Sequence, residues 1–279
     1  KKNNIKTIIY KININQLRNY LIKMSTNQLF NGQHRISNIM VQRSRDTIYN
    51  ILQRALAPST LYNYAKNDSC IDYLDIYGPT YGYQPNQESE GSKLLKQIGI
   101  QFEKEVFKSI EEKCQQHNLK CVQLPSSHTI NFYDRYMETQ SLLDRGVDVI
   151  IHGGVADLSN EIKGIPDLIL RTDTTSVLFN TNPFEIEDDS RYYYTACDIK
   201  SSRIKFKSDD EHITSGGNFP YYKIQSWVYN LCLSRMTGFL SPKSYLLGTS
   251  YSYSNNREVY NDPFYTLGII DPEEKIGLD

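Results

Sequence analysis

The chain has 279 residues, enough to bury a substantial core in one large domain or in one domain with a helical extension. A formal net charge of −1 excludes a protein drawn to nucleic acid by bulk charge, but not one that uses a local basic groove. Its 5 scattered cysteines contain no Cys-x-x-Cys, and no apolar run approaches a membrane span, so we expect a soluble, intracellular and cytoplasmic protein without a disulfide framework.

Residues 1–90 are predicted to form a helical region that carries little chemistry. Apolar residues recur at helical spacing in segments 14–24 and 48–56, and Ser59 or Thr60 is expected to cap a further short helix. Arg45 and Arg54 belong either to a solvated helix face or to a wall of a nucleic-acid channel. Residues 77–91 are rich in Gly, Pro, Gln and Ser and are predicted to be an exposed loop.

A longer helix is predicted over residues 92–117. Its main apolar stripe is expected to contain Leu95, Ile98, Phe102, Val106 and Ile110. Glu103 falls beside this stripe and is the one acid of the helix aimed inward. Such a glutamate is either a structural residue with its own partner or a ligand.

Short strands are predicted at 121–124, 147–152 and 165–170 because β-branched residues gather there between Gly, Ser and Asn turns. His152 ends one of them, and the sequence His152-Gly153-Gly154 belongs either to the neighbourhood of a site or, as is usual for a lone histidine at a strand end, to an incidental position. Asp167 interrupts the apolar run of another. A buried carboxylate needs a cation or a hydrogen-bond donor, so we expect one beside Asp167. The alternative is a turn or capping interaction.

A surface excursion is predicted over residues 172–190, which include an acidic cluster at 185–189. The strand that follows contains Asp198, Ile199 and Lys200. Alternate side chains of a strand share a face, so Asp198 and Lys200 are expected to project together while Ile199 packs behind them. They form either a structural ion pair or part of a reactive site. Lys205 and Lys207 come next, before a polar loop at 208–217, and are candidate contacts for nucleic acid.

The last predicted helix begins near Pro220 and ends before Gly238, because Pro favours the first turn and Gly follows the last. Gln225 and Tyr229 lie four residues apart and therefore share one face of this helix. Late strands are expected at 245–247 and 264–270. Together these elements predict a helix before residue 145 and an order of strand, strand and helix after it.

Three carboxylates and one lysine are thus predicted to converge: Glu103, Asp167, Asp198 and Lys200. Hard oxygen ligands of this kind suit Mg²⁺ or Mn²⁺, whereas zinc would require a set of His or Cys ligands that the sequence does not offer. A cation held by Asp167 and Asp198 would polarise a phosphodiester. Lys200 would orient or deprotonate the attacking water.

These residues resemble the motifs of the PD-(D/E)xK metal-dependent nucleases. Pro166-Asp167 matches the first half of the motif and Asp198-Ile199-Lys200 the second. The RecB-like branch, which includes lambda-type exonucleases, also has an upstream helical Glu and a downstream Gln-x-x-x-Tyr, and Glu103 and Gln225 through Tyr229 are similar to these. The composition further resembles that of giant-virus proteins, and the whole is similar to nucleases of their virophage-defence system. That likeness implies a viral protein in the host cell or virion.

The resemblance implies an α/β fold with a restriction-endonuclease-like core over residues 91–279, in which helices flank a central mixed sheet. Residues 1–90 would form an N-terminal helical extension. It implies that one or two Mg²⁺ or Mn²⁺ ions are bound by Asp167, Asp198, the main-chain carbonyl of Ile199 and Glu103. Lys200 would then be the base or water-orienting residue, and Gln225 and Tyr229 would position Lys200 or the substrate.

The activity implied is a metal-dependent deoxyribonuclease that hydrolyses DNA from its ends. The alternatives are an endonuclease of the same superfamily and a catalytically inactive nucleic-acid-binding module. DNA is the expected partner, and a helicase partner and a homo-oligomer are both compatible with the family. Many relatives hold an iron–sulfur cluster through one early and three late cysteines. No cysteine follows Cys232, so no cluster is expected.

Overall fold

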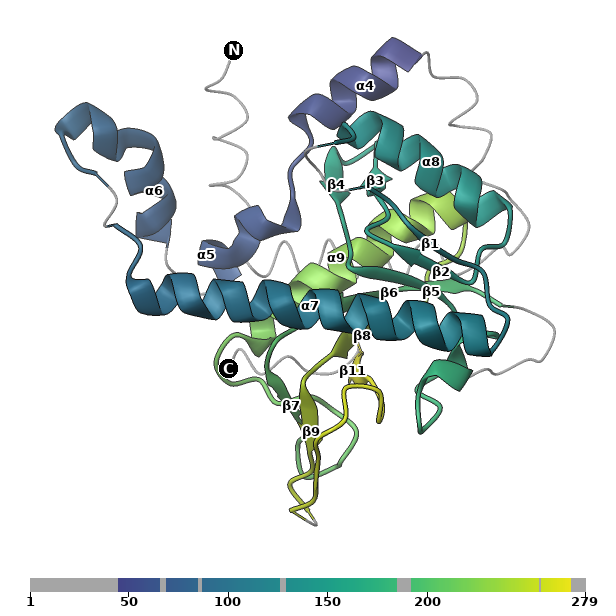
Figure 1. Cartoon of the computed structure of the whole chain (residues 1–279). Coiled ribbons are helices and arrows are strands. Elements are labelled where there is room, and N and C mark those ends of the chain that lie inside the picture. The colour runs from purple at the N-terminus through teal and green to yellow at the C-terminus, as the bar shows by residue number, and fades with distance from the viewer. Residues whose placement is uncertain are drawn as a thin grey trace.

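The computed structural model describes residues 45–65, 69–84, 87–125, 129–184, 192–255 and 257–271. The predicted helix at 14–24 and the acidic cluster at 185–189 lie outside these ranges. The described part is an α/β fold in which helices flank a mixed sheet of six strands, as the sequence predicted (Figure 1). None of the described helices is both long and apolar enough to cross a membrane.

The central sheet has the strand order β1-β2-β5-β6-β8-β11. Two neighbouring pairs, β1 with β2 and β6 with β8, are parallel, and the other pairs are antiparallel. A parallel pair needs a crossover connection, which a helix supplies in both cases. The strand bounds are β1 Cys121–Gln123, β2 Val149–Ile151, β5 Leu168–Arg171, β6 Tyr194–Ile199, β8 Ser244–Leu247 and β11 Gly268–Ile270.

Helices cover both faces of this sheet. Helix α7 (Glu90–Gln116) packs on one face, while α8 (Phe132–Asp144) and α9 (Phe219–Thr237) pack on the other (Figure 1). The strands supply side chains to both faces by alternation. In β2, for example, Ile150 joins the core under α8 and α9, and its two neighbours join the core under α7. This double burial explains why the strands read as continuous apolar runs.

The apolar stripe predicted for α7 is buried only in its second half. Val106 and Ile110 are buried against the sheet, whereas Leu95 is 69% and Ile98 51% exposed. The first half of α7 extends beyond the sheet toward α6 (Ser69–Tyr77), so its apolar residues have no strand beneath them (Figure 1). The prediction of one continuous buried stripe was therefore wrong for Leu95 and Ile98.

Helical segments precede α7 in the described chain, as predicted. Helix α4 (Arg45–Arg54) buries Ile48 and Leu52 in the core under α8, and η1 (Pro58–Leu61) and α5 (Tyr62–Ala65) follow it. The predicted cap was wrong, because η1 begins at Pro58 after Ala57 and no side chain caps it. The predicted loop at 77–91 contains a short helix, η2 (Gly78–Tyr81).

Several elements were not predicted. Helix α8 was missed because its buried face carries Arg135 and Thr139, which are 1% and 0% exposed and break the apolar period. The remaining missed elements have two to four residues each, too few for a clear period. They are β3 Val155–Asp157, β4 Ile162–Gly164, η3 Thr175–Leu178, β7 Arg203–Lys205, β9 Ser250–Ser252 and β10 Val259–Tyr260.

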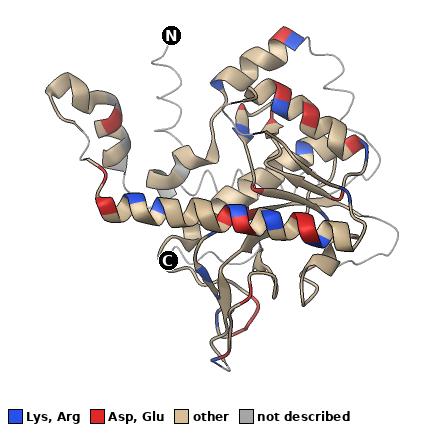
Figure 2. Cartoon of the chain, viewed as in Figure 1, with Lys and Arg blue, Asp and Glu red and all other residues tan. Residues whose placement is uncertain are grey.

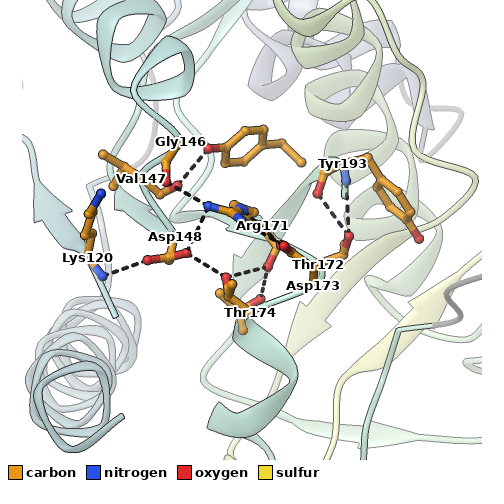
Figure 3. A network of polar contacts seen from close by, with 11 residues as sticks. Lys120, Gly146, Val147, Asp148, Arg171, Thr172, Asp173, Thr174 and Tyr193 are labelled. Carbon is orange, nitrogen blue, oxygen red and sulfur yellow. Dashed lines mark hydrogen bonds and ion pairs between the residues drawn. The ribbon is translucent and has the colours of Figure 1, made fainter. Parts of the chain in front are cut away.

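A polar network ties the end of β5 to its neighbours (Figure 3). The Arg171 guanidinium donates to the carbonyl of Gly146 at 3.1 Å, lies 3.4 Å from Asp148 Oδ1 and makes two hydrogen bonds with Asp173. Asp148 is 7% exposed, and its other oxygen accepts from Lys120 N at 2.8 Å. One arginine thus links β5 to the turns that begin β1 and β2.

Replacing Arg171 with methionine is expected to lower the free energy of unfolding by roughly 1–3 kcal/mol, because buried Asp148 loses its cation. Chemical denaturation followed by circular dichroism measures the change. Asp173→Asn is the matched control, since it removes only the more exposed partner and should have a smaller effect. Equal stability of Arg171→Met and the native chain would contradict the structural role of this network.

Candidate active site

Strands β5 and β6 bring Asp167 and Asp198 together, as the sequence predicted. The strands pair antiparallel with Leu168 opposite Cys197, so Asp167, just before β5, lies beside the end of β6. Asp167 Oδ2 accepts a hydrogen bond from Ile199 N at 2.6 Å. This is the donor expected beside Asp167. Asp198 is 2% exposed, and Ile199 packs in the core under α7.

Lys200 follows β6 and projects with Asp198. Its ammonium forms an ion pair with Asp198 Oδ2, donates to Gln225 Oε1 at 3.3 Å and lies 4.9 Å from the centre of the Tyr222 ring. Gln225 Nε2 in turn donates to the Tyr229 hydroxyl at 2.9 Å. The four predicted residues Asp198, Lys200, Gln225 and Tyr229 therefore form one chain of polar contacts between β6 and α9.

The Tyr229 ring at the end of this chain packs on the backbone of Gly164. A Cβ atom at Gly164 would lie 2.3 Å from Tyr229 Cε1, far inside van der Waals contact. Only glycine leaves room for the ring here. Burial raises the pKa of Tyr229, so its hydroxyl stays protonated and can both accept from Gln225 and donate elsewhere.

Glu103 approaches the same place from α7, where it meets a residue that the sequence analysis treated as incidental. His152 Nε2 lies 3.0 Å from Glu103 Oε1, and the imidazole packs edge-on against Phe107 with ring centres 4.8 Å apart. The His152 backbone N–H donates to the carbonyl of Asp167 at 3.0 Å. The available signal was the sequence His152-Gly153-Gly154 directly after an apolar strand, which indicates a tight, special turn.

Within the described residues, Glu103, His152 and Asp167 form a group that could hold a metal ion, since their ligand atoms all lie within 4.8 Å of one another. Two carboxylates and an imidazole suit a divalent cation but do not specify which one. Zinc was not expected because the sequence offers no set of His or Cys ligands, but His152 does add one imidazole to this group. Asp198 is not in this group, and its Oδ2 pairs with Lys200 Nζ. The role of the Ile199 carbonyl as a ligand stays a prediction.

The charges of the site alter one another. Burial and the nearby Asp198 charge raise the pKa of Asp167, against the opposing effect of Lys200. Burial alone would lower the pKa of Lys200, but the charges of Asp198 and Asp167 outweigh it and the pKa rises. Lys200 is therefore a protonated cation at neutral pH in the metal-free protein. A bound divalent cation would favour the ionised form of Asp167.

The four candidate contacts for nucleic acid do not gather in one place. The Arg45 guanidinium lies 5.4 Å from the centre of the Tyr133 ring, and Arg54 forms an exposed ion pair with Glu161 at 2.5 Å. Lys205 and Lys207 lie on or just after β7, at the opposite side of the molecule from α4 (Figure 1). Lys and Arg are interspersed with Asp and Glu along α7, and α8 carries both signs of charge, so neither helix presents a purely basic face (Figure 2).

The comparison with protein-family models finds none that matches the chain, and the comparison with curated proteins finds no match. The function of the chain is therefore inferred from the arrangement of its own residues. Glu103, His152 and Asp167 form a group beside an Asp198–Lys200 ion pair, at one end of the central sheet.

Proposed function

We propose that this chain is a metal-dependent nuclease that hydrolyses DNA phosphodiester bonds from DNA ends. The observation that carries the proposal is the convergence of Glu103, His152 and Asp167, from three separate elements, on a place beside the buried Asp198–Lys200 pair. All three side chains are half-buried, and burial together with the Asp198 and Glu103 charges raises the pKa of Asp167. Titratable groups whose pKa values are shifted by close neighbours are typical of functional sites.

In this proposal Glu103, His152 and Asp167 hold a divalent cation, with Asp198 next to them. When bound, such a cation polarises the phosphodiester and lowers the pKa of a water molecule. Lys200 orients the attacking water and offsets negative charge that develops on the phosphate, which suits its protonated state. Gln225 and Tyr229 hold Lys200 in place through the 3.3 Å and 2.9 Å contacts described above.

The preference for DNA ends follows the resemblance of Asp167, Asp198, Lys200 and Gln225 to the RecB-like branch. On the basis of the same resemblance, we propose that the ion is Mg²⁺ or Mn²⁺ and that the partner is DNA. We also propose that the protein acts in the host cytoplasm or in the virion. The imidazole of His152 makes Mn²⁺ the better candidate of the two ions, because nitrogen ligands suit transition metals better than Mg²⁺.

An end-labelled linear duplex is expected to be degraded in Mn²⁺ or Mg²⁺ while a covalently closed circle stays intact, and EDTA should abolish the reaction. Gel electrophoresis of both substrates over time measures this, and the position of the label gives the polarity. Asp198→Ala should lose the activity, because Lys200 then has no carboxylate to hold it. Asp173→Ala, on the far end of β5, is the matched control and should retain it.

If the closed circle is degraded as well, the protein is an endonuclease and the proposed dependence on DNA ends is wrong. A folded protein that leaves both substrates intact in Mg²⁺, Mn²⁺ and Zn²⁺ would overturn the enzymatic proposal and favour a binding module. Zinc belongs in the series because His152 adds an imidazole to the ligand set.

A further inference from the structure

The turn at residues 152–154 holds the imidazole of the site in an unusual backbone conformation. His152 has φ 58°, in the left-handed region that residues with a Cβ atom rarely adopt. A strained conformation persists only where its surroundings over-determine it. The contacts that hold this turn therefore decide where the imidazole lies.

Helix α8 supplies two of these contacts. The Arg135 guanidinium donates to the carbonyl of His152 at 2.5 Å and also to the carbonyl of Pro125. Two residues beyond His152, the backbone N–H of Gly154 donates to the Thr139 hydroxyl at 2.8 Å, and that hydroxyl donates to the carbonyl of Arg135. Both side chains are almost fully buried, Arg135 at 1% and Thr139 at 0%.

The turn is also packed closely enough to require both of its glycines. A Cβ atom at Gly153 would lie 2.6 Å from Ile169 Cδ1, and one at Gly154 would lie 2.9 Å from Arg135 Cγ. The stem of Arg135 thus presses on the same turn that its guanidinium holds. Side chains of helix α8 and strand β5 thus pack against the turn from which the imidazole meets Glu103.

Core stability alone does not account for a guanidinium at this place. The Arg135 side chain is 1% exposed, and its hydrogen bonds described above go to neutral carbonyls rather than to a carboxylate. Carbonyl dipoles return only part of the solvation that a buried cation loses. An apolar side chain would fill the same core position without that loss, but it would leave the His152 carbonyl unheld.

We propose that Arg135 and Thr139 are positioning residues, which fix the turn at 152–154 so that His152 meets Glu103 and Asp167 with the geometry needed to bind a divalent cation. The inference rests on the proposed function, since it requires these three side chains to hold a metal ion. Residues that orient a metal-binding histidine commonly change metal affinity by about 10- to 100-fold when replaced.

The test measures Mn²⁺ binding to the full chain by isothermal titration calorimetry, together with the ¹⁴N coupling to bound Mn²⁺ by pulsed electron paramagnetic resonance. Arg135→Met should weaken Mn²⁺ binding about 10- to 100-fold and reduce the ¹⁴N coupling. His152→Gln, which removes the imidazole, should abolish the ¹⁴N coupling. Arg135→Lys should recover part of both, because its ammonium can still donate to one carbonyl. Thr139→Val, which removes only the hydroxyl, should weaken binding by a smaller factor.

Arg235→Met is the matched control. Arg235 is a partly buried arginine of α9 that pairs with Asp157 at 3.1 Å, so its loss should lower stability without changing Mn²⁺ affinity. Native affinity and full ¹⁴N coupling in folded Arg135→Met would overturn the inference and leave the proposed function standing. If that variant does not fold, the same result in Thr139→Val would overturn it. Absence of Mn²⁺ binding by the native chain would overturn the proposed metal site and this inference with it.

Discussion

Replacing Lys200 with alanine is expected to slow DNA cleavage by about 10²- to 10⁴-fold at neutral pH, the usual range for loss of a residue that assists proton transfer or charge development. Lys200 contacts both the buried carboxylate of Asp198 and the amide of Gln225, and alanine can make neither contact. Initial rates on end-labelled linear DNA, at saturating Mn²⁺, measure the effect.

The loss of Lys200 also leaves Asp198 buried without its cation, so the variant's thermal unfolding must be measured beside its activity. Lys108→Ala removes an exposed lysine of α7 that pairs with Glu112, so this control should cleave DNA at the native rate. Undiminished cleavage by a folded Lys200→Ala protein would refute the role given to Lys200.

Lys200→Arg separates the two roles that the sequence left open. An arginine keeps the positive charge but does not release its proton at any accessible pH. The charges of Asp198 and Asp167 raise the pKa of Lys200, which favours a cation that orients water over a base that deprotonates it. Lys200→Arg should therefore retain more activity than Lys200→Ala; equal loss in both would support the base.

The contacts that could be predicted from the sequence are those set by local periodicity. Alternation along a strand places Asp198 and Lys200 on one face, and a four-residue spacing along a helix places Gln225 next to Tyr229, where the hydrogen bond is 2.9 Å. The pairing of β5 with β6, which joins Asp167 to Ile199, followed from two apolar runs separated by a surface excursion.

The contact between His152 and Glu103 joins residues 49 positions apart and depends on a left-handed backbone turn at His152. The spacing of apolar residues does not predict such a turn. That turn is held by Arg135 and Thr139. Both are polar residues on the buried face of α8, so they interrupt the apolar spacing from which a helix is predicted. The same limit applies to Leu95, whose spacing fits a buried stripe although the sheet ends before it. Long-range packing decides all three.

Asp167→Asn is expected to leave the metal-free protein as stable as the native chain, or more stable, while it abolishes metal binding. The folded state raises the pKa of Asp167 above its ordinary value of 3.8 through burial and the Asp198 charge, so the folded chain binds this proton more tightly than the unfolded one. Stability from this group is therefore lost as pH rises above about 4. At neutral pH an asparagine removes that unfavourable charge, and its amide oxygen can still accept from Ile199 N.

Thermal unfolding with and without Mn²⁺ gives the decisive comparison. Mn²⁺ at a free concentration of 100 times its dissociation constant should stabilise the native chain by about 2.7 kcal/mol, whereas Asp167→Asn should gain little. With metal present, the native chain should therefore be more stable than the variant. Cleavage by the variant should fall more than about 10²-fold. Asp173→Asn, an aspartate near the other end of β5, should respond to Mn²⁺ as the native chain does. An undiminished response in Asp167→Asn would remove Asp167 from the metal site, and a less stable metal-free variant would show that its charge serves the fold instead.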